Sequence, residues 1–173
     1  MDILSKIRNI PDFPKPGIQF KDITTLLADP EGFNAVIFNL AKRYHDAGLT
    51  KIVGVESRGF IFGAALAHAL GLGFVPVRKE GKLPHETLGK SYELEYGSAT
   101  IEIHKDALTP DDRVVIIDDL MATGGTLEAT VHLVEQLGAE IAEVWVLMEL
   151  SFLNGKGKLG GVPYHAEISI GEE

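Results

Sequence analysis

The sequence predicts an α/β fold in which a mostly parallel central sheet is flanked by helices. Short apolar runs alternate along the chain with segments of helical periodicity, as in repeated strand–helix–strand units. The run Arg113–Ile117 is continuously aliphatic after its first residue, which is typical of a strand buried on both faces of a parallel sheet. The 173 residues match the length of one domain, so we expect residues 1–173 to form a single domain.

Composition restricts the classes of function that remain. The chain has 25 acidic and 16 basic residues, a net charge of −9, and no cysteine. We expect no nucleic-acid partner, because such binding depends on Lys and Arg neutralising phosphates. The lack of cysteine excludes a disulfide framework and a thiolate site. No apolar run approaches the ~18 residues of a membrane span, so we expect a cytoplasmic protein that binds no membrane.

Two stretches before residue 50 carry distinct signals. Residues 11–22 hold three of the eight prolines and are predicted to form one extended, rigid segment. Asp29 and Pro30 predict a helix start, with Asp29 as N-cap and Pro30 as the first helical residue. Apolar residues follow at steps of three and four positions, and Gly48 is predicted to close the helix.

A strand–helix–strand unit comes next. Lys51–Val55 is predicted to be a short apolar strand, and the helix after it runs to about Leu70. Gly71 and Gly73 then turn the chain into a second strand, Phe74–Arg78.

A loop and a hairpin follow this unit. Residues 79–90 are polar and rich in Lys and Gly, so we expect a long, mobile loop there. Residues 91–96 and 99–104 alternate on either side of Gly97-Ser98, which predicts a β-hairpin.

The second half of the chain repeats the alternation. The strand Arg113–Ile117 ends at Asp118-Asp119, and a turn through Gly124-Gly125 leads into a helix that Gly138 closes. Ile141–Leu150 is the next predicted strand. Parallel sheets of this kind bind ligands beyond the carboxyl ends of their strands.

Residues 114–126, VVIIDDLMATGGT, combine features suited to a sugar phosphate. A buried strand delivers two carboxylates to its carboxyl end, where they can accept hydrogen bonds from ribose hydroxyls. The glycine-rich turn lets backbone N–H groups converge at a helix N-terminus, which forms a phosphate cradle. An ordinary strand-to-helix turn with Asp and Thr as caps is the alternative.

This string of residues resembles the phosphoribosyl-pyrophosphate signature of the type I phosphoribosyltransferases. The resemblance implies the fold of that family, with a small N-terminal hood and a flexible catalytic loop and hairpin. It implies that Asp118 and Asp119 hold the ribose hydroxyls. The residues implied to hold the 5′-phosphate are Ala122, Thr123, Gly124, Gly125 and Thr126.

Two further segments resemble the pyrophosphate-binding parts of this family. The first is Glu56, Ser57 and Arg58, where the resemblance implies a cis peptide bond between Glu56 and Ser57. A surface turn with Ser57 as N-cap is the alternative, whereas a nucleophile elbow is excluded because Val55 stands where that motif needs Gly.

The second segment is a run of basic residues, Arg78, Lys79 and Lys82. On a flexible loop these cations suit a pyrophosphate that is covered and then released. Some of them would act from a neighbouring subunit, and a plain solvated charged loop is the alternative.

Residues 11–24 resemble the hood of the family members that use adenine, so we expect a hood formed by about residues 7–30 and the C-terminal region. The resemblance implies that Phe20 stacks on the purine, with Leu150 on the opposite face. The Gln19 backbone and Lys21 would meet the polar edge of the base. Many members carry Arg where this chain has Lys21, and Lys lacks the planar fork of Arg. Simple core filling is the alternative for Phe20.

The implied reaction is that of adenine with 5-phosphoribosyl 1-pyrophosphate (PRPP), giving AMP and pyrophosphate in purine salvage. The resemblance implies a homodimer, Glu95 as the catalytic group at the imidazole edge of the purine, and Mg²⁺ bound through PRPP and water with no direct protein ligand. Two alternatives are a transferase for hypoxanthine, guanine or xanthine and a non-catalytic regulator that binds PRPP.

Overall fold

The computed structural model describes residues 1–94 and 96–171, and the chain divides into two compact units, Met1–Arg43 and Tyr44–Glu173. The first unit contains a small antiparallel sheet and helices. Its elements in chain order are η1 (Leu4–Lys6), β1 (Arg8–Pro11), β2 (Gln19–Asp22), α1 (Thr24–Ala28) and α2 (Pro30–Tyr44), of which the last extends one residue beyond the unit.

Strands β1 and β2 form a hairpin, with Arg8 opposite Asp22. The prediction of one extended segment over residues 11–22 is therefore wrong, because the chain reverses within it. Asp12 and Gly17 adopt positive φ angles of 55° and 87°, and the Gly17 amide donates a hydrogen bond of 2.8 Å to the Asp12 carboxylate. The prolines restrict their own φ angles, but these two residues determine the direction of the chain.

Helix α2 begins at Pro30, as predicted. Asp29 acts as its N-cap, since its carboxylate accepts hydrogen bonds from the amides of Glu31 and Gly32. An ion pair with Lys6, of 2.7 Å between Nζ and Oδ2, is the main cause that lowers the pKa of Asp29. The helix ends at Tyr44 rather than Gly48, which lies in the following turn.

The second unit is built on a seven-stranded sheet in the order β5-β6-β4-β3-β7-β8-β9. Strands β4, β3, β7, β8 and β9 are parallel, and β6 and β5 continue the sheet in antiparallel pairing. The predicted mostly parallel sheet is thus confirmed. The strands are β3 (Lys51–Val55), β4 (Gly73–Lys79), β5 (Thr87–Glu93), β6 (Ser98–His104), β7 (Arg113–Met121), β8 (Glu140–Leu150) and β9 (Tyr164–Ile170).

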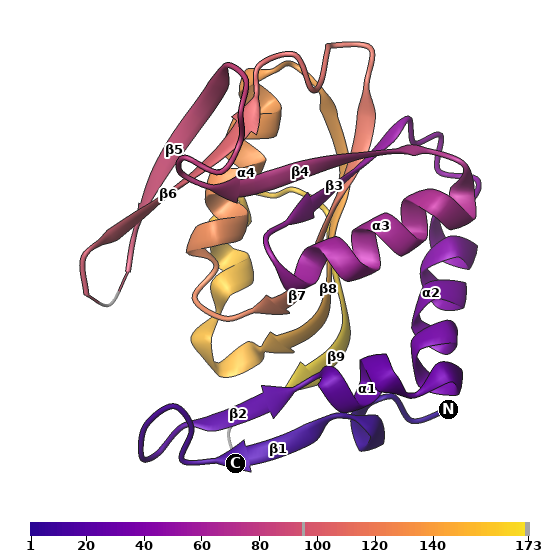
Figure 1. The fold of residues 1–173 in the computed structure, drawn as a ribbon, viewed down its shortest axis with the longest axis vertical. Coiled ribbons are helices and arrows are strands. Elements are labelled where there is room, and N and C mark those ends of the chain that lie inside the picture. Colours follow the sequence, from indigo (N-terminus) through magenta and orange to yellow (C-terminus); the bar gives the residue numbers. More distant parts are fainter. Residues whose placement is uncertain (95, 172–173) are drawn as a thin grey trace. The chain divides into compact units, whose positions relative to one another are not determined.

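Two helices cover this sheet (Figure 1). Helix α3 (Arg58–Leu70) packs on β3, β4 and β7, and α4 (Gly125–Gln136) contacts β5, β6 and β8. The chain passes from β3 to β4 toward one edge of the sheet and from β7 to β8 toward the other. Right-handed crossovers in opposite directions place the two helices on opposite faces.

The central strands form the core because their side chains are aliphatic on both faces. Val53 and Val55 of β3, and Ile116 and Ile117 of β7, are at most 1% exposed. Their burial fixes the two strands whose carboxyl ends carry the site. Among the described residues, no helix is long and apolar enough to cross a membrane.

Three features differ from the sequence prediction. Strand β5 begins at Thr87, so the loop before it is shorter than predicted, and β7 continues past Ile117 to Met121. After β8 the chain forms short 3₁₀ helices η2 (Ser151–Leu153) and η3 (Gly155–Leu159), followed by β9, which sequence analysis did not identify. Strand β9 depends on parallel pairing with β8, a tertiary contact that local residue patterns do not encode.

Candidate active site

The candidate site lies where the two central parallel strands end. Strands β3 and β7 are neighbours, with Gly54 opposite Ile117. The chain leaves them toward opposite edges of the sheet, which opens a crevice beyond their carboxyl ends. Glu56 directly follows β3, and Asp118 and Asp119 belong to the last part of β7. Residues about 60 positions apart in the sequence therefore meet in one place.

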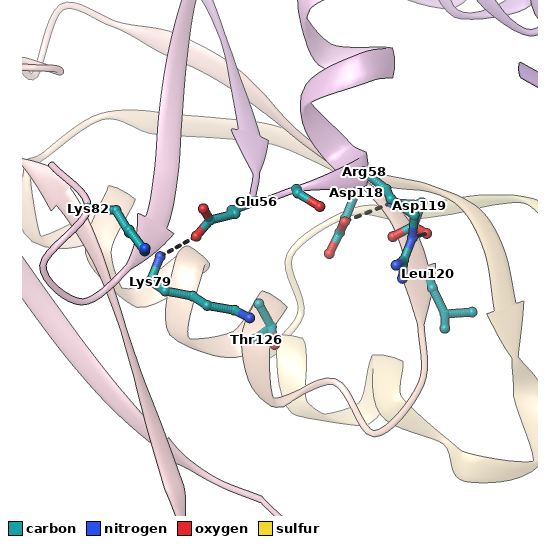
Figure 2. Close-up of a pocket in the computed structure, with 9 residues that line it drawn as sticks. Glu56, Arg58, Lys79, Lys82, Asp118, Asp119, Leu120 and Thr126 are labelled. Atoms are coloured by element: carbon teal, nitrogen blue, oxygen red, sulfur yellow. Dashed lines mark hydrogen bonds and ion pairs between the residues drawn. The ribbon is translucent and has the colours of Figure 1, made fainter. Parts of the chain in front are cut away.

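A cavity of about 530 Å³ occupies this crevice. It brings together seven of the eight residues predicted to hold ribose and pyrophosphate; Arg78 is the one that does not line it. Figure 2 shows Arg58 beside Asp119, and Lys79 and Lys82 near Glu56. The cavity is lined by Glu56, Ser57, Arg58, Lys79, Lys82, Asp118, Asp119, Leu120 and Thr126.

A second cavity, of about 90 Å³, lies at the turn between β7 and α4. Its lining includes all five residues predicted to hold a 5′-phosphate, from Ala122 to Thr126. Asp118, Leu120 and Thr126 line both cavities, so the two adjoin. The start of α4, with Gly124 as N-cap and the positive end of the helix dipole, favours an anion at this point.

Close backbone packing shapes the smaller cavity. Gly124 precedes α4 with φ +88°, a conformation that favours glycine. A Cβ atom on Gly124 would collide with the carbonyl oxygen of Gly155, and one on Gly155 would collide with that of Ala122. Gly155, the first residue of η3, therefore packs closely against the turn that precedes α4. Sequence analysis did not identify this contact.

Two adjacent carboxylates lie at the end of β7, and both are buried. The Asp119 amide donates a hydrogen bond of 2.8 Å to Oδ1 of Asp118, and Nε of Arg58 lies 2.5 Å from Oδ2 of Asp119. Burial, and then the charge of Asp119, raise the pKa of Asp118 well above its ordinary value. The hydrogen bond from the Asp119 amide and the ion pair with Arg58 hold the acceptor oxygens in place. These oxygens can meet groups that donate hydrogen bonds or carry positive charge.

Hydrogen bonds from two residues of β4 hold the Glu56 carboxylate in place. Its Oε1 accepts hydrogen bonds from Nη2 and Nε of Arg78 at 2.6 and 3.1 Å, and its Oε2 accepts one from the Lys79 amide at 2.8 Å. Burial acts to raise the pKa of Glu56, but the Lys79 amide and the Arg78 guanidinium outweigh it and lower that pKa. Arg78 therefore connects the end of β4 to the turn after β3.

The turn after β3 agrees with the expected geometry. The peptide bond between Glu56 and Ser57 is cis, as predicted. Ser57 occupies the N-cap position of α3, but among the described residues its hydroxyl makes no capping hydrogen bond. The alternative of a plain capping turn is thus not supported.

The residues predicted to bind the base lie in both units. Gln19, Phe20 and Lys21 belong to β2 of the first unit, and Leu150 ends β8 of the second. The Phe20 ring packs edge-on against Phe13, with centroids 5.2 Å apart.

Side-chain hydrogen bonds within the β1–β2 hairpin hold Gln19 and Lys21 in place. Nζ of Lys21 donates a hydrogen bond of 2.9 Å to Oδ1 of Asn9, whose amide nitrogen donates to Gln19 at 2.8 Å. Phe20 stays half-buried. The predicted catalytic residue Glu95 lies outside the described part of the chain.

Comparisons with known proteins agree with this geometry. A model of the phosphoribosyl transferase domain matches residues 22–159. An adenine phosphoribosyltransferase of Solidesulfovibrio magneticus is 60% identical over 159 residues, covering 92% of this chain and 93% of the relative.

Solved structures give the same result. A crystal structure of the adenine phosphoribosyltransferase of Thermoanaerobacter pseudethanolicus has a TM-score of 0.93 and 53% identity, covering 98% of both chains. The Saccharomyces cerevisiae enzyme, complexed with an imino-altritol bisphosphate and adenine, has a TM-score of 0.90 and 43% identity, covering 95% of this chain and 96% of that one.

Proposed function

This chain belongs to the phosphoribosyl transferase family, and we propose that it transfers the 5-phosphoribosyl group of PRPP to N9 of adenine, giving AMP and pyrophosphate. The observation that carries this proposal is the pair of adjoining cavities that join two buried carboxylates to a glycine-rich turn. Their linings suit the two ends of PRPP: the turn at the start of α4 suits the 5′-phosphate, and the cationic side chains suit the pyrophosphate. The 60% identity to a relative named adenine phosphoribosyltransferase supports adenine as the base.

In this proposal the smaller cavity holds the 5′-phosphate. The amides from Ala122 to Thr126 converge on it, and the Thr123 and Thr126 hydroxyls add donors. Asp118 and Asp119 accept hydrogen bonds from the ribose 2′- and 3′-hydroxyls. The ribose would then lie between the two cavities, where the residues shared by both linings are found.

The pyrophosphate group is assigned to the larger cavity. Arg58, Lys79 and Lys82 place positive charge there, and the turn at Glu56 and Ser57 contributes backbone groups. Arg78 acts through Glu56, since their ion pair holds the turn against β4.

The reaction forms a bond between N9 of adenine and the anomeric carbon as the bond from that carbon to pyrophosphate breaks, with inversion. The ribose passes through a cationic, oxocarbenium-like state. The carboxylates of Asp118 and Asp119 stabilise that charge, while the lysines and Arg58 stabilise the leaving pyrophosphate. We assign Glu95 to the imidazole edge of the purine, where it acts as a general acid–base group toward the N9 proton.

The donor set fits a magnesium ion carried by the substrate. Among the described residues no group of three or more His, Asp or Glu side chains could form a metal site. Both oxygens of the Glu56 carboxylate already accept hydrogen bonds from Arg78 and Lys79. Asp118 and Asp119 remain as oxygen acceptors near the ribose. A magnesium ion carried by the substrate would supply positive charge that helps to neutralise the leaving pyrophosphate.

We propose that Phe20, the Gln19 backbone and Lys21 of the first unit contact the base; for Leu150 of the second unit that role stays a prediction from the resemblance. Phe20 offers an aromatic face for the purine, and the hydrogen bond from Lys21 to Asn9 holds that amine near the strand.

We further propose that the protein acts in the cytoplasm as a homodimer.

The decisive experiment measures pyrophosphate release from PRPP with adenine, hypoxanthine, guanine and xanthine in parallel. We expect release with adenine, and none when Mg²⁺ is omitted. Release with another purine and none with adenine would reassign the base. PRPP binding without release with any base would indicate a regulator.

A further inference from the structure

The loop between β4 and β5 carries Lys82 into the larger cavity, and a side chain on a third strand holds it there. Lys79 and Lys82 begin and end a tight turn, in which the Lys82 amide donates to the Lys79 carbonyl at 3.2 Å. Gly81 is the third residue of this turn with φ +81°, as a type II turn requires. The position of Lys82 therefore depends on the orientation of this turn.

Glu102 of β6 accepts hydrogen bonds from both ends of the loop. Its Oε1 receives the Gly81 amide at 2.7 Å, and its Oε2 receives the Thr87 hydroxyl. Glu102 lies opposite Arg78 of β4 and opposite Gly89 of β5, so it stands between the strand that enters the loop and the strand that leaves it. One carboxylate thus bridges the turn and the start of β5.

Other contacts from the same strand support this arrangement. The Glu80 amide donates to the Thr100 carbonyl at 3.0 Å, and the His85 amide donates to Nε2 of His104 at 3.3 Å. The loop therefore follows β6 along its length. The Glu102 contacts involve a charged acceptor, and such hydrogen bonds are about twice as strong as neutral ones.

We propose that Glu102 is a positioning residue, which acts through the Gly81 turn to hold the Lys82 ammonium at the pyrophosphate part of the cavity. This inference rests on the proposed function for the nature of the ligand. Glu102 lies outside the lining of the cavity. Its loss leaves the Gly81 amide and the Thr87 hydroxyl without their acceptor, so the turn samples other orientations and Lys82 is displaced.

The kinetic test uses the reverse reaction of AMP with pyrophosphate. We expect Glu102→Gln to raise the KM for pyrophosphate about five- to tenfold, with the KM for AMP within twofold, as loss of hydrogen bonds to a charged group predicts. Thr87→Val should give a smaller change in the same direction, and Thr87→Ser should restore the wild-type value. Glu86→Gln is the matched control, because it removes the same charge from an exposed side chain of the same loop.

A second background tests whether Glu102 acts through Lys82. In a Lys82→Ala protein, adding Glu102→Gln should change the KM for pyrophosphate by less than twofold. An undiminished effect in that background would show that Glu102 acts by another route and would overturn the proposal. The same conclusion follows if Glu102→Gln behaves like Glu86→Gln.

Amide hydrogen exchange provides a readout that needs no turnover. The Gly81 amide should exchange at least about tenfold faster in Glu102→Ala, or in Thr87→Val if that variant alone folds, while amides of α4 keep their rates. Unchanged exchange at Gly81 would contradict the proposal. A wild-type protein that does not convert AMP and pyrophosphate would instead refute the proposed function, and the exchange result would still decide the role of Glu102.

Discussion

The guanidinium Nε of Arg58 lies 2.5 Å from Oδ2 of Asp119, so an ion pair joins the first residue of α3 to the end of β7. The Arg58 side chain is 49% exposed, whereas that of Asp119 is only 8% exposed. Arg58 therefore has room to contact a ligand while it neutralises a carboxylate that has little access to water. Substitution tests whether Arg58 also has the proposed role toward pyrophosphate.

Arg58→Ala should raise the KM for PRPP about tenfold or more, since it removes a charge-assisted contact to pyrophosphate. The KM for adenine should stay within twofold. Steady-state kinetics with each substrate varied in turn measures both values. Arg113→Ala serves as control, because it removes an ion pair with Glu140 at the opposite ends of the strands. Equal increases in both KM values would contradict the assignment of Arg58 to pyrophosphate.

Asp118→Asn should raise the melting temperature at pH 7 by about 2–5 °C and abolish most activity. The raised pKa of Asp118 means that the folded protein holds this proton more tightly than the unfolded chain. Its contribution to the free energy of unfolding is therefore greatest below pH 3.8, the ordinary value, and is lost as the pH rises toward the raised pKa. The gain from Asn, which keeps an acceptor for the Asp119 amide, should shrink toward pH 4.

Thermal melts of both proteins between pH 4 and pH 8 measure this difference. Asp111→Asn is the matched control, because it removes the same charge from an exposed side chain. A gain that is independent of pH would show that the buried charge of Asp118 is not its cause.

Gly155→Ala should lower kcat/KM for PRPP about tenfold or more and reduce the melting temperature by about 2–6 °C, the effect of overpacking by one methyl group. The φ angle of Gly155 is not positive, so steric contact alone opposes the change. Its Cβ would lie 2.7 Å from Sδ of Met121 and would also strike the Ala122 carbonyl.

Gly157→Ala, two residues along η3, provides the control. A Cβ atom there would lie 3.3 Å from the Asn154 side-chain amide, which is free to move aside. We expect its kcat/KM to stay within twofold of wild type. Similar losses in both variants would mean that η3, rather than its contact with the phosphate-binding turn, is sensitive.

Glu95→Ala should lower kcat by at least about 100-fold, the usual contribution of a general acid–base group, with far less effect on PRPP binding. Single-turnover kinetics and a separate PRPP titration measure the two quantities. Glu93→Ala, on the same hairpin, controls for the loss of a carboxylate. Equal losses in catalysis and in PRPP affinity would remove Glu95 from the catalytic role.

The parts of the site that follow one strand could be predicted from the sequence. The continuous aliphatic run before Asp118 indicates burial, and the glycine-rich turn that follows it lines the smaller cavity, where the sequence predicts a phosphate cradle. The turn after β3 and its cis peptide bond also agree with the prediction. The aliphatic run and the glycine-rich turn are local, so a short window of residues contains their cause, whereas the cis peptide bond was implied by the resemblance to the family.

Features that depend on tertiary contacts were missed. Gly155 packs against the glycine-rich turn from about 30 residues away, and Glu102 accepts a hydrogen bond from the loop between β4 and β5. The loop before β5 was predicted to be too long because Thr87 and its neighbours are polar, yet they pair with β6. Arg78 was assigned to a ligand, whereas its guanidinium hydrogen-bonds to Glu56.

The position of β3 at the centre of the sheet has a consequence for how the chain folds. During synthesis β4 leaves the ribosome soon after β3, whereas β7, the other neighbour of β3, begins about 60 residues after β3 begins. Until then one edge of β3 has no partner, and closing so long a loop is slow. The crevice between β3 and β7 therefore forms only after about two thirds of the chain has been made. A nascent chain that stalls earlier exposes an apolar strand edge open to aggregation.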